Sequence, residues 1–162
     1  MNASEGATAI ALRRLILALI FLGATGMLVD LILLEHFENA WQWAPLALLI
    51  PVIALTIMVA VRPSRSFLRA FQASMLSCIV VGVLGVFLHY RGNVEFELER
   101  DPALRGFALF WETIRGATPA LAPGAMVQLG LLGLAFTFRH PMLGTFTTRV
   151  PAQAPHHSTE IQ

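Results

Sequence analysis

The sequence predicts an all-α fold, a four-helix transmembrane bundle with an outer-face amphipathic helix in the third loop. Of the 162 residues, 56% are hydrophobic and only 13% are charged, about half the charged fraction of a soluble domain. Four apolar runs are each close to the roughly 20 residues that a helix needs to cross a bilayer. The runs lack the alternation of barrel strands, and backbone groups in lipid must bond internally, so the runs predict helices.

The predicted spans share this continuous apolar character and lie at residues 12–34, 44–61, 67–89 and 118–138. They form one membrane domain over residues 1–141. The polar tail at 142–162 is predicted to be disordered. Arg13 and Arg14 precede an apolar run that is too long for a cleaved signal peptide, so the first span is predicted to be a retained signal anchor.

The arginines predict how the chain is oriented in the membrane. Seven of them lie on one side with two acids, and four lie on the other side with seven acids. The basic side carries Arg13, Arg14, Arg62, Arg65, Arg69, Arg139 and Arg149. We therefore expect the N and C termini on the cytoplasmic side, and Trp41 and Trp43 in an aromatic belt at the outer surface.

The outer loop, residues 90–117, is long enough to have structure of its own. Apolar and acidic residues alternate over 94–99, which predicts an extended segment. Asp101 and Pro102 have the chemistry of a helix N-cap and first helical residue, and apolar residues follow at helical spacing. The sequence predicts an amphipathic helix over 102–115, which lies on the outer membrane surface or packs over the mouth of the bundle.

Asp30 is the most informative single residue, because an acid inside a span is costly unless it faces protein or water. Gly23 and Gly26 share its helical face, and small residues in a span favour close helix packing. The third span has its own small face, formed by Ser74, Cys78, Gly82, Gly85 and His89. We expect the two faces to pack together and shield Asp30. Its role is either proton or cation coupling or, as a structural alternative, a hydrated or hydrogen-bonded acid.

Acids and imidazoles gather at the predicted outer face. Glu35, His36, Glu38 and His89 are candidate ligands for zinc, manganese or another divalent ion. Counting residues from the cytoplasmic ends puts His36 level with His89, so this pair could also ligate a haem. The alternative is a solvated acidic interface, and no cofactor is assigned.

The remaining polar residues predict no chemistry. Cys78 is the only cysteine, so a disulfide or a thiolate-rich metal site within the chain is excluded. Gln128 is expected to hydrogen-bond across helices, and Ser74 and Ser77 to bond back to their own helix. No catalytic motif is present, so the protein is not predicted to be an enzyme. No basic patch remains for nucleic acid.

Three segments carry a resemblance: the acidic turn Leu34-Glu-His-Phe-Glu-Asn-Ala-Trp-Gln, the run His89-Tyr-Arg-Gly-Asn-Val-Glu-Phe-Glu, and Gly116 to Gly124 followed by Arg139-His-Pro141. Together they are similar to a set of uncharacterised bacterial four-span integral membrane proteins. The resemblance covers roughly residues 12–141 and implies a bacterial inner (plasma) membrane location. It implies no catalytic residue.

These observations favour a non-catalytic subunit or accessory protein of a larger membrane complex. Chemistry or transport needs several polar groups that face one cavity, and only Asp30 and Gln128 lie deep in the predicted spans. The expected partners are the lipid bilayer and either other membrane subunits or further copies of the chain. The alternatives are a small oligomeric transporter coupled through Asp30, and an outer-face metal or haem module built on His36 and His89.

Overall fold

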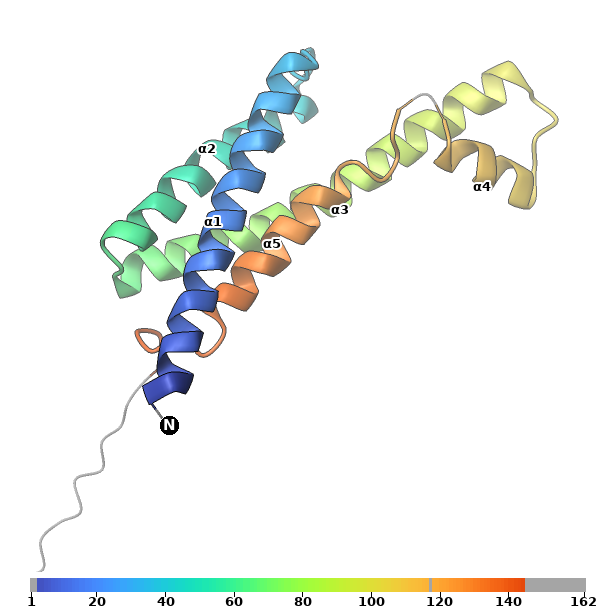
Figure 1. Cartoon of the computed structure of the whole chain (residues 1–162). Coiled ribbons are helices and arrows are strands. Elements are labelled where there is room, and N and C mark those ends of the chain that lie inside the picture. The colour runs from blue at the N-terminus through green and yellow to red at the C-terminus, as the bar shows by residue number, and fades with distance from the viewer. Residues whose placement is uncertain (1–2, 117, 145–162) are drawn as a thin grey trace, which may run out of the picture.

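A computed structural model describes residues 3–116 and 118–144, which form five α-helices and no strand within that part of the chain (Figure 1). The helices are α1 (Ala3–Leu33), α2 (Ala40–Val61), α3 (Arg65–Arg100), α4 (Gly106–Ile114) and α5 (Gly124–Thr137). The all-α prediction is confirmed. Most of the tail predicted to be disordered, 145–162, lies outside the described residues.

Three of the helices, α1, α2 and α3, are long and apolar enough to cross a membrane. The fourth predicted span is shorter than expected, because α5 has only 14 residues and begins at Gly124 rather than near residue 118. The preceding residues form tight turns, in which the Ala122 and Gly124 amides bond to the carbonyls of Pro119 and Leu121. Two prolines, Pro119 and Pro123, have no amide hydrogen to donate, which delays the regular helix.

Four of the helices, α1, α2, α3 and α5, pack around a common core, each against two of the others. The most extensive contact joins α3 and α5, and α2 packs on α3 while α1 packs on α2 and α5. The core residues come from α1, α2, α3 and α5. They are Ile20, Ala24, Leu49, Val52, Val59, Leu68, Phe71, Met75, Cys78, Met126, Leu129 and Phe136. No Cα atom of α1 lies within 8 Å of a Cα atom of α3, so the predicted pairing of their small faces is wrong.

The small face of α3 packs against α5 instead. A Cβ atom added at Gly82 would lie 2.8 Å from a methyl of Val127, and one added at Gly85 would lie 2.7 Å from the Pro123 ring. A glycine of α5 lies at the same interface, since a Cβ atom added at Gly130 would lie 2.5 Å from the carbonyl oxygen of Met75. The two backbones therefore approach as closely as glycine allows.

α3 continues far beyond its apolar part, so the predicted extended segment at 94–99 is wrong. Its 36 residues correspond to about 54 Å at the rise of an α-helix, against roughly 30 Å of bilayer hydrocarbon. Figure 1 shows its C-terminal part reaching past the other long helices, with α4 beside it. Asn93 and Glu97, one helical turn apart, are both buried on this extension, and this spacing fits a helix rather than a strand.

α4 is shorter than the predicted helix over 102–115. Asp101 caps the end of α3 rather than the start of α4, and its carboxylate accepts a hydrogen bond from the Ala103 amide. α4 packs on α3 alone and does not cover the mouth of the bundle. Its exposed aromatic side chains include Phe107, Phe110 and Trp111.

Candidate functional site

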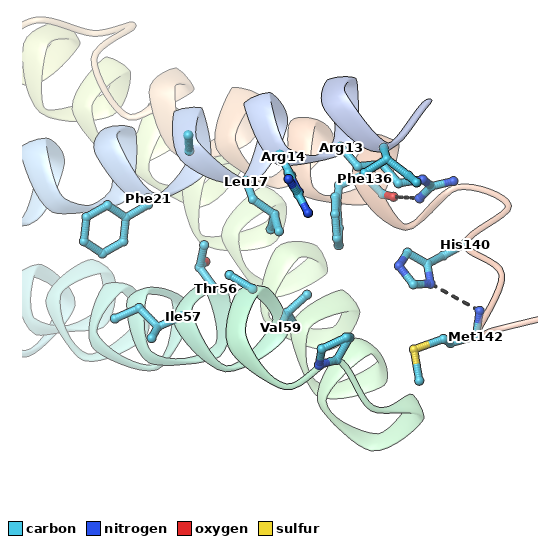
Figure 2. A pocket seen from close by; sticks show the side chains of 14 residues that line it. Arg13, Arg14, Leu17, Phe21, Thr56, Ile57, Val59, Phe136, His140 and Met142 are labelled. Carbon is cyan, nitrogen blue, oxygen red and sulfur yellow. Dashed lines mark hydrogen bonds between the residues drawn. The ribbon is translucent and has the colours of Figure 1, made fainter. Parts of the chain in front are cut away.

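A groove of about 750 Å³ lies between α1, α2 and the end of α5 (Figure 2). Its lining is mostly apolar and combines Ile10, Leu17, Ala18, Phe21, Ile57, Val59, Ala60, Pro63, Phe136 and Met142 with the polar Arg13, Arg14, Thr56 and His140. The 14 lining residues include two arginines and no acid.

The groove exists because α1 and α2 diverge. The two helices lie close together near the connection at 34–39 and separate toward the opposite end of the bundle (Figure 1). At that end Arg13 ties α1 to α5, since its guanidinium donates to the carbonyl oxygens of Phe136 (2.5 Å), Phe138 (3.2 Å) and Arg139 (3.3 Å). These bonds satisfy carbonyls that the end of α5 leaves without helical partners.

Arg14 has a different environment from its neighbour. Its side chain is exposed, and Figure 2 shows it directed into the space between α1 and α2. It forms no hydrogen bond or ion pair with the residues that the structure describes. Among the described residues, Arg14 is therefore an unpaired cation at the wall of an apolar groove.

His140 closes the groove beside Arg13. The backbone reverses at Arg139, which has a left-handed conformation (φ 47°), and the Met142 amide donates to His140 Nδ1 over 3.3 Å. Burial, and secondly the charge of Arg13, lowers the pKa of His140. The lowered pKa favours the neutral imidazole, in which Nδ1 accepts from the Met142 amide and Nε2–H remains as a donor. Thr56 adds no free donor, because its hydroxyl donates to the Val52 carbonyl.

Sequence reasoning missed this groove. It used Arg13 and Arg14 only as orientation signals, although Ile10, Arg14, Leu17 and Phe21 recur at the spacing of one helical face. That stripe was the available signal. It could not reveal that the face lines a gap, because the divergence of α1 from α2 is a property of the packed bundle.

The two predicted outer-face histidines come together at the other end of the bundle. α1 ends in a Schellman motif, in which the His36 amide bonds to the Leu31 carbonyl and Glu35 is left-handed (φ 51°). The rings of His36 and His89 lie 6.2 Å apart between centroids. Burial, and secondly His89, lowers the pKa of His36.

The described residues contain no group of three or more His, Cys, Asp or Glu that could hold a metal ion. Glu35 and Glu38 do not complete a ligand set with the histidines, and metal sites use three or four protein ligands as a rule. His89 Nδ1 lies 3.2 Å from the Pro119 carbonyl oxygen. The histidines therefore place the turn that follows α1 beside α3, and α3 beside the segment that leads into α5.

Asp30 and Gln128 differ from their predicted settings. Asp30 is exposed rather than shielded by the third span, and it lines neither the groove between α1 and α2 nor the hollow beside Gln128. Gln128 is exposed and makes no hydrogen bond across helices within the described residues. The backward bonds of Ser74 and Ser77, to the Ala70 and Ala73 carbonyls, are confirmed.

No protein-family model, no curated protein and no solved structure matches this chain. The helices and the groove therefore define its class without a relative. The chain is an all-helical protein, and its three long apolar helices indicate a membrane protein.

Proposed function

We propose that the protein is a non-catalytic accessory subunit of a larger bacterial inner-membrane complex, and that α1 docks on a transmembrane helix of another subunit. The observation that carries the proposal is the side of α1 that faces away from the bundle. It presents an apolar seam at coiled-coil spacing, formed by Leu12, Leu15, Leu19, Leu22, Gly26, Val29 and Leu33.

Two residues distinguish this seam from an ordinary lipid-facing surface. Gly26 has open space where a Cβ would lie, so a neighbouring helix can approach closely there. Asp30, one turn further, is an exposed carboxylate next to the seam. A carboxylate that faces lipid costs roughly 3 kcal/mol at the centre of a span and less at the depth of Asp30, which lies three residues before the end of α1. A partner that donates a hydrogen bond reduces this cost.

The charge on this face favours a different protein over a second copy. Two copies that dock in parallel through the same seam would bring their Asp30 carboxylates to the same depth, where like charges repel. A partner helix with an arginine, lysine, histidine or amide at that depth complements Asp30 instead. The proposed partner is therefore a transmembrane helix with a donor group.

The proposal includes four membrane crossings with both termini in the cytoplasm. α5 supplies 14 residues, about 21 Å of helix. The five residues 119–123 adopt tight turns and add about 10 Å at the rise of a 3₁₀-helix. The total is about 31 Å, which matches the hydrocarbon thickness of a bilayer.

Site-specific photo-crosslinking in native membranes tests the docking face. A photoreactive residue at Leu22, which is 69% exposed on the seam, is compared with one at Val80, which is 66% exposed on α3. We expect one defined adduct with another membrane protein from position 22 and none from position 80. The same adducts from both positions, or only a dimer of this chain, would overturn the proposal.

A matched pair of glycine variants tests the close approach. Gly26→Leu fills the space on the seam, whereas Gly92→Leu fills an equally open space on the α3 extension. The first variant should reduce partner recovery after mild detergent extraction at least tenfold, and the second should leave it unchanged. Asp30→Asn, which keeps one hydrogen-bonding oxygen, should weaken recovery less than Asp30→Leu.

A further inference from the structure

We propose that the groove between α1 and α2 binds one anionic phospholipid, with an acyl chain along the apolar lining and the phosphate on Arg14. This site is separate from the docking seam. Arg14 lies on the side of α1 that borders the groove, whereas the seam faces away from the bundle. Arg14 and the seam can therefore be changed independently.

The dimensions of the groove fit a lipid chain in one leaflet. Its lining on α1 runs from Ile10 to Phe21, which corresponds to about 16 Å of helix. Half of the bilayer hydrocarbon is about 15 Å thick. Since α1 and α2 diverge toward the Arg13 end (Figure 1), the groove opens sideways to the lipid and toward the headgroup layer. A chain that enters there covers apolar side chains of both helices.

The charges of the groove select the headgroup. The carbonyls at the end of α5 occupy the Arg13 guanidinium, while Arg14 has no partner among the described residues. The lining contains no acid that would repel a phosphate. Basic pockets between transmembrane helices on the cytoplasmic side bind anionic headgroups, and arginine matches a phosphate with two parallel hydrogen bonds. Neutral His140 offers a further donor at the same end.

The source of the phosphate is a lipid rather than a soluble anion, because most of the lining is hydrocarbon. An inorganic phosphate would use only the mouth of the groove and leave residues such as Leu17 and Ile57 uncovered. Burial of apolar surface contributes roughly 25 cal/mol per Å², so a chain in the groove adds affinity that a free anion lacks.

Native mass spectrometry of the full-length protein, stripped of lipid in detergent, measures the binding directly. Phosphatidylglycerol and phosphatidylcholine with the same acyl chains are added separately. We expect one phosphatidylglycerol to bind at least tenfold more tightly than phosphatidylcholine. Equal binding of the two lipids would overturn the proposal.

Two pairs of variants locate the site. Arg14→Gln should weaken phosphatidylglycerol binding about tenfold or more, since a hydrogen bond to a charged group is lost. Arg69→Gln removes the same charge at the same end of the bundle but outside the groove, and should have no effect. Ala60→Trp fills the groove without a change of charge and should also abolish binding, whereas Ala54→Trp, exposed on α2 outside the groove, should not.

Each remaining outcome decides between a lipid site and another explanation. If Arg14→Gln and Arg69→Gln behave alike, the lipid is held by diffuse charge and the site is refuted. If inorganic phosphate displaces phosphatidylglycerol and Ala60→Trp leaves binding intact, the groove holds a free anion and the lipid proposal fails. Circular dichroism of each variant shows that it is folded before binding is measured.

Discussion

Arg13 and Arg14 are adjacent arginines with opposite structural roles, and replacing each by alanine separates them. Arg13 donates to three carbonyl oxygens at the end of α5 and lies over the Phe136 ring, 6.0 Å from its centroid. Arg14 makes no such bond to a described residue. We therefore expect Arg13→Ala to loosen the attachment of α1 to α5, and Arg14→Ala to leave it intact in lipid-free detergent.

The magnitude follows from the bonds that are lost. A hydrogen bond to a charged group contributes about 1.5–3 kcal/mol, and a cation at a helix C-terminus about 0.3–1 kcal/mol. Arg13 is half-buried, so solvent screening reduces both contributions. A net loss of about 2 kcal/mol remains, which for a chain of this length lowers Tm by roughly 4–8 °C.

Thermal unfolding in detergent micelles without added lipid, followed by circular dichroism, measures the difference. Arg14→Ala is the matched control, because it removes the same charge one residue away and should change Tm by less than about 2 °C, as exposed substitutions do. Equal shifts for the two variants would show that Arg13 contributes only its charge. The inference that it caps α5 would then be refuted.

Three further predictions concern the outer end and the helix termini. Asn93 donates to the Thr113 and Thr118 carbonyls and accepts from the Thr118 amide. The variant Asn93→Ala should therefore lose about 2–3 kcal/mol of local stability and raise amide hydrogen exchange at Thr113 and Thr118. Unchanged exchange would contradict this prediction. The backbone of Glu35 has a left-handed conformation (φ 51°) at the end of α1. Because glycine adopts this conformation without strain, Glu35→Gly should stabilise the protein by about 0.5–1 kcal/mol, measured as a rise in Tm. A fall in Tm would show that the Glu35 side chain is needed. The pKa of His36 is lowered in the folded protein, so the unfolded chain binds protons more readily, and stability present at pH 8 should be lost as the pH falls through the folded pKa. The variant His36→Gln should make this loss smaller in a series of Tm measurements at different pH. His140 adds a contribution of the same sign, which remains in the variant.

The sequence was sufficient to predict the long helices but not to predict which helices pack against one another. Long apolar runs leave only helices in lipid, so α1, α2 and α3 could be predicted from composition. The alternation at 94–99 was misleading, because the burial of Asn93 depends on Thr113 and Thr118, which lie far along the chain and bond to its side chain in the folded protein.

Helix pairing could not be predicted for a related reason. Small residues mark a surface for close packing but do not identify the helix that uses it. On α5, Gly130 and Gly133 lie opposite Met75 of α3. The small surface of α3 therefore packs on α5 and not on α1. The displacement of α1 from α3 leaves Asp30 exposed. The divergence of α1 from α2 opens the groove, so neither site is visible before the packing is known.

The course of the chain through the membrane gives the last prediction. The bonds from Arg13 to the Phe136, Phe138 and Arg139 carbonyls place the end of α5 beside the start of α1. If the 119–137 segment crosses the bilayer, Gly6 and Gly144 must therefore lie on the same side, and Gly92 on the other. Each of these glycines has room for a side chain, so each can be replaced by cysteine.

Labelling with a membrane-impermeant maleimide distinguishes the topologies. The native Cys78 is fully buried and is replaced by alanine to remove its background. We expect Gly92→Cys to react in intact spheroplasts, and Gly6→Cys and Gly144→Cys only in inverted vesicles. If Gly144→Cys reacts together with Gly92→Cys, α5 does not cross and the bond from Arg13 to α5 cannot form in the membrane. If all three positions react from the reversed sides, the four crossings stand and only the orientation deduced from the arginines is wrong.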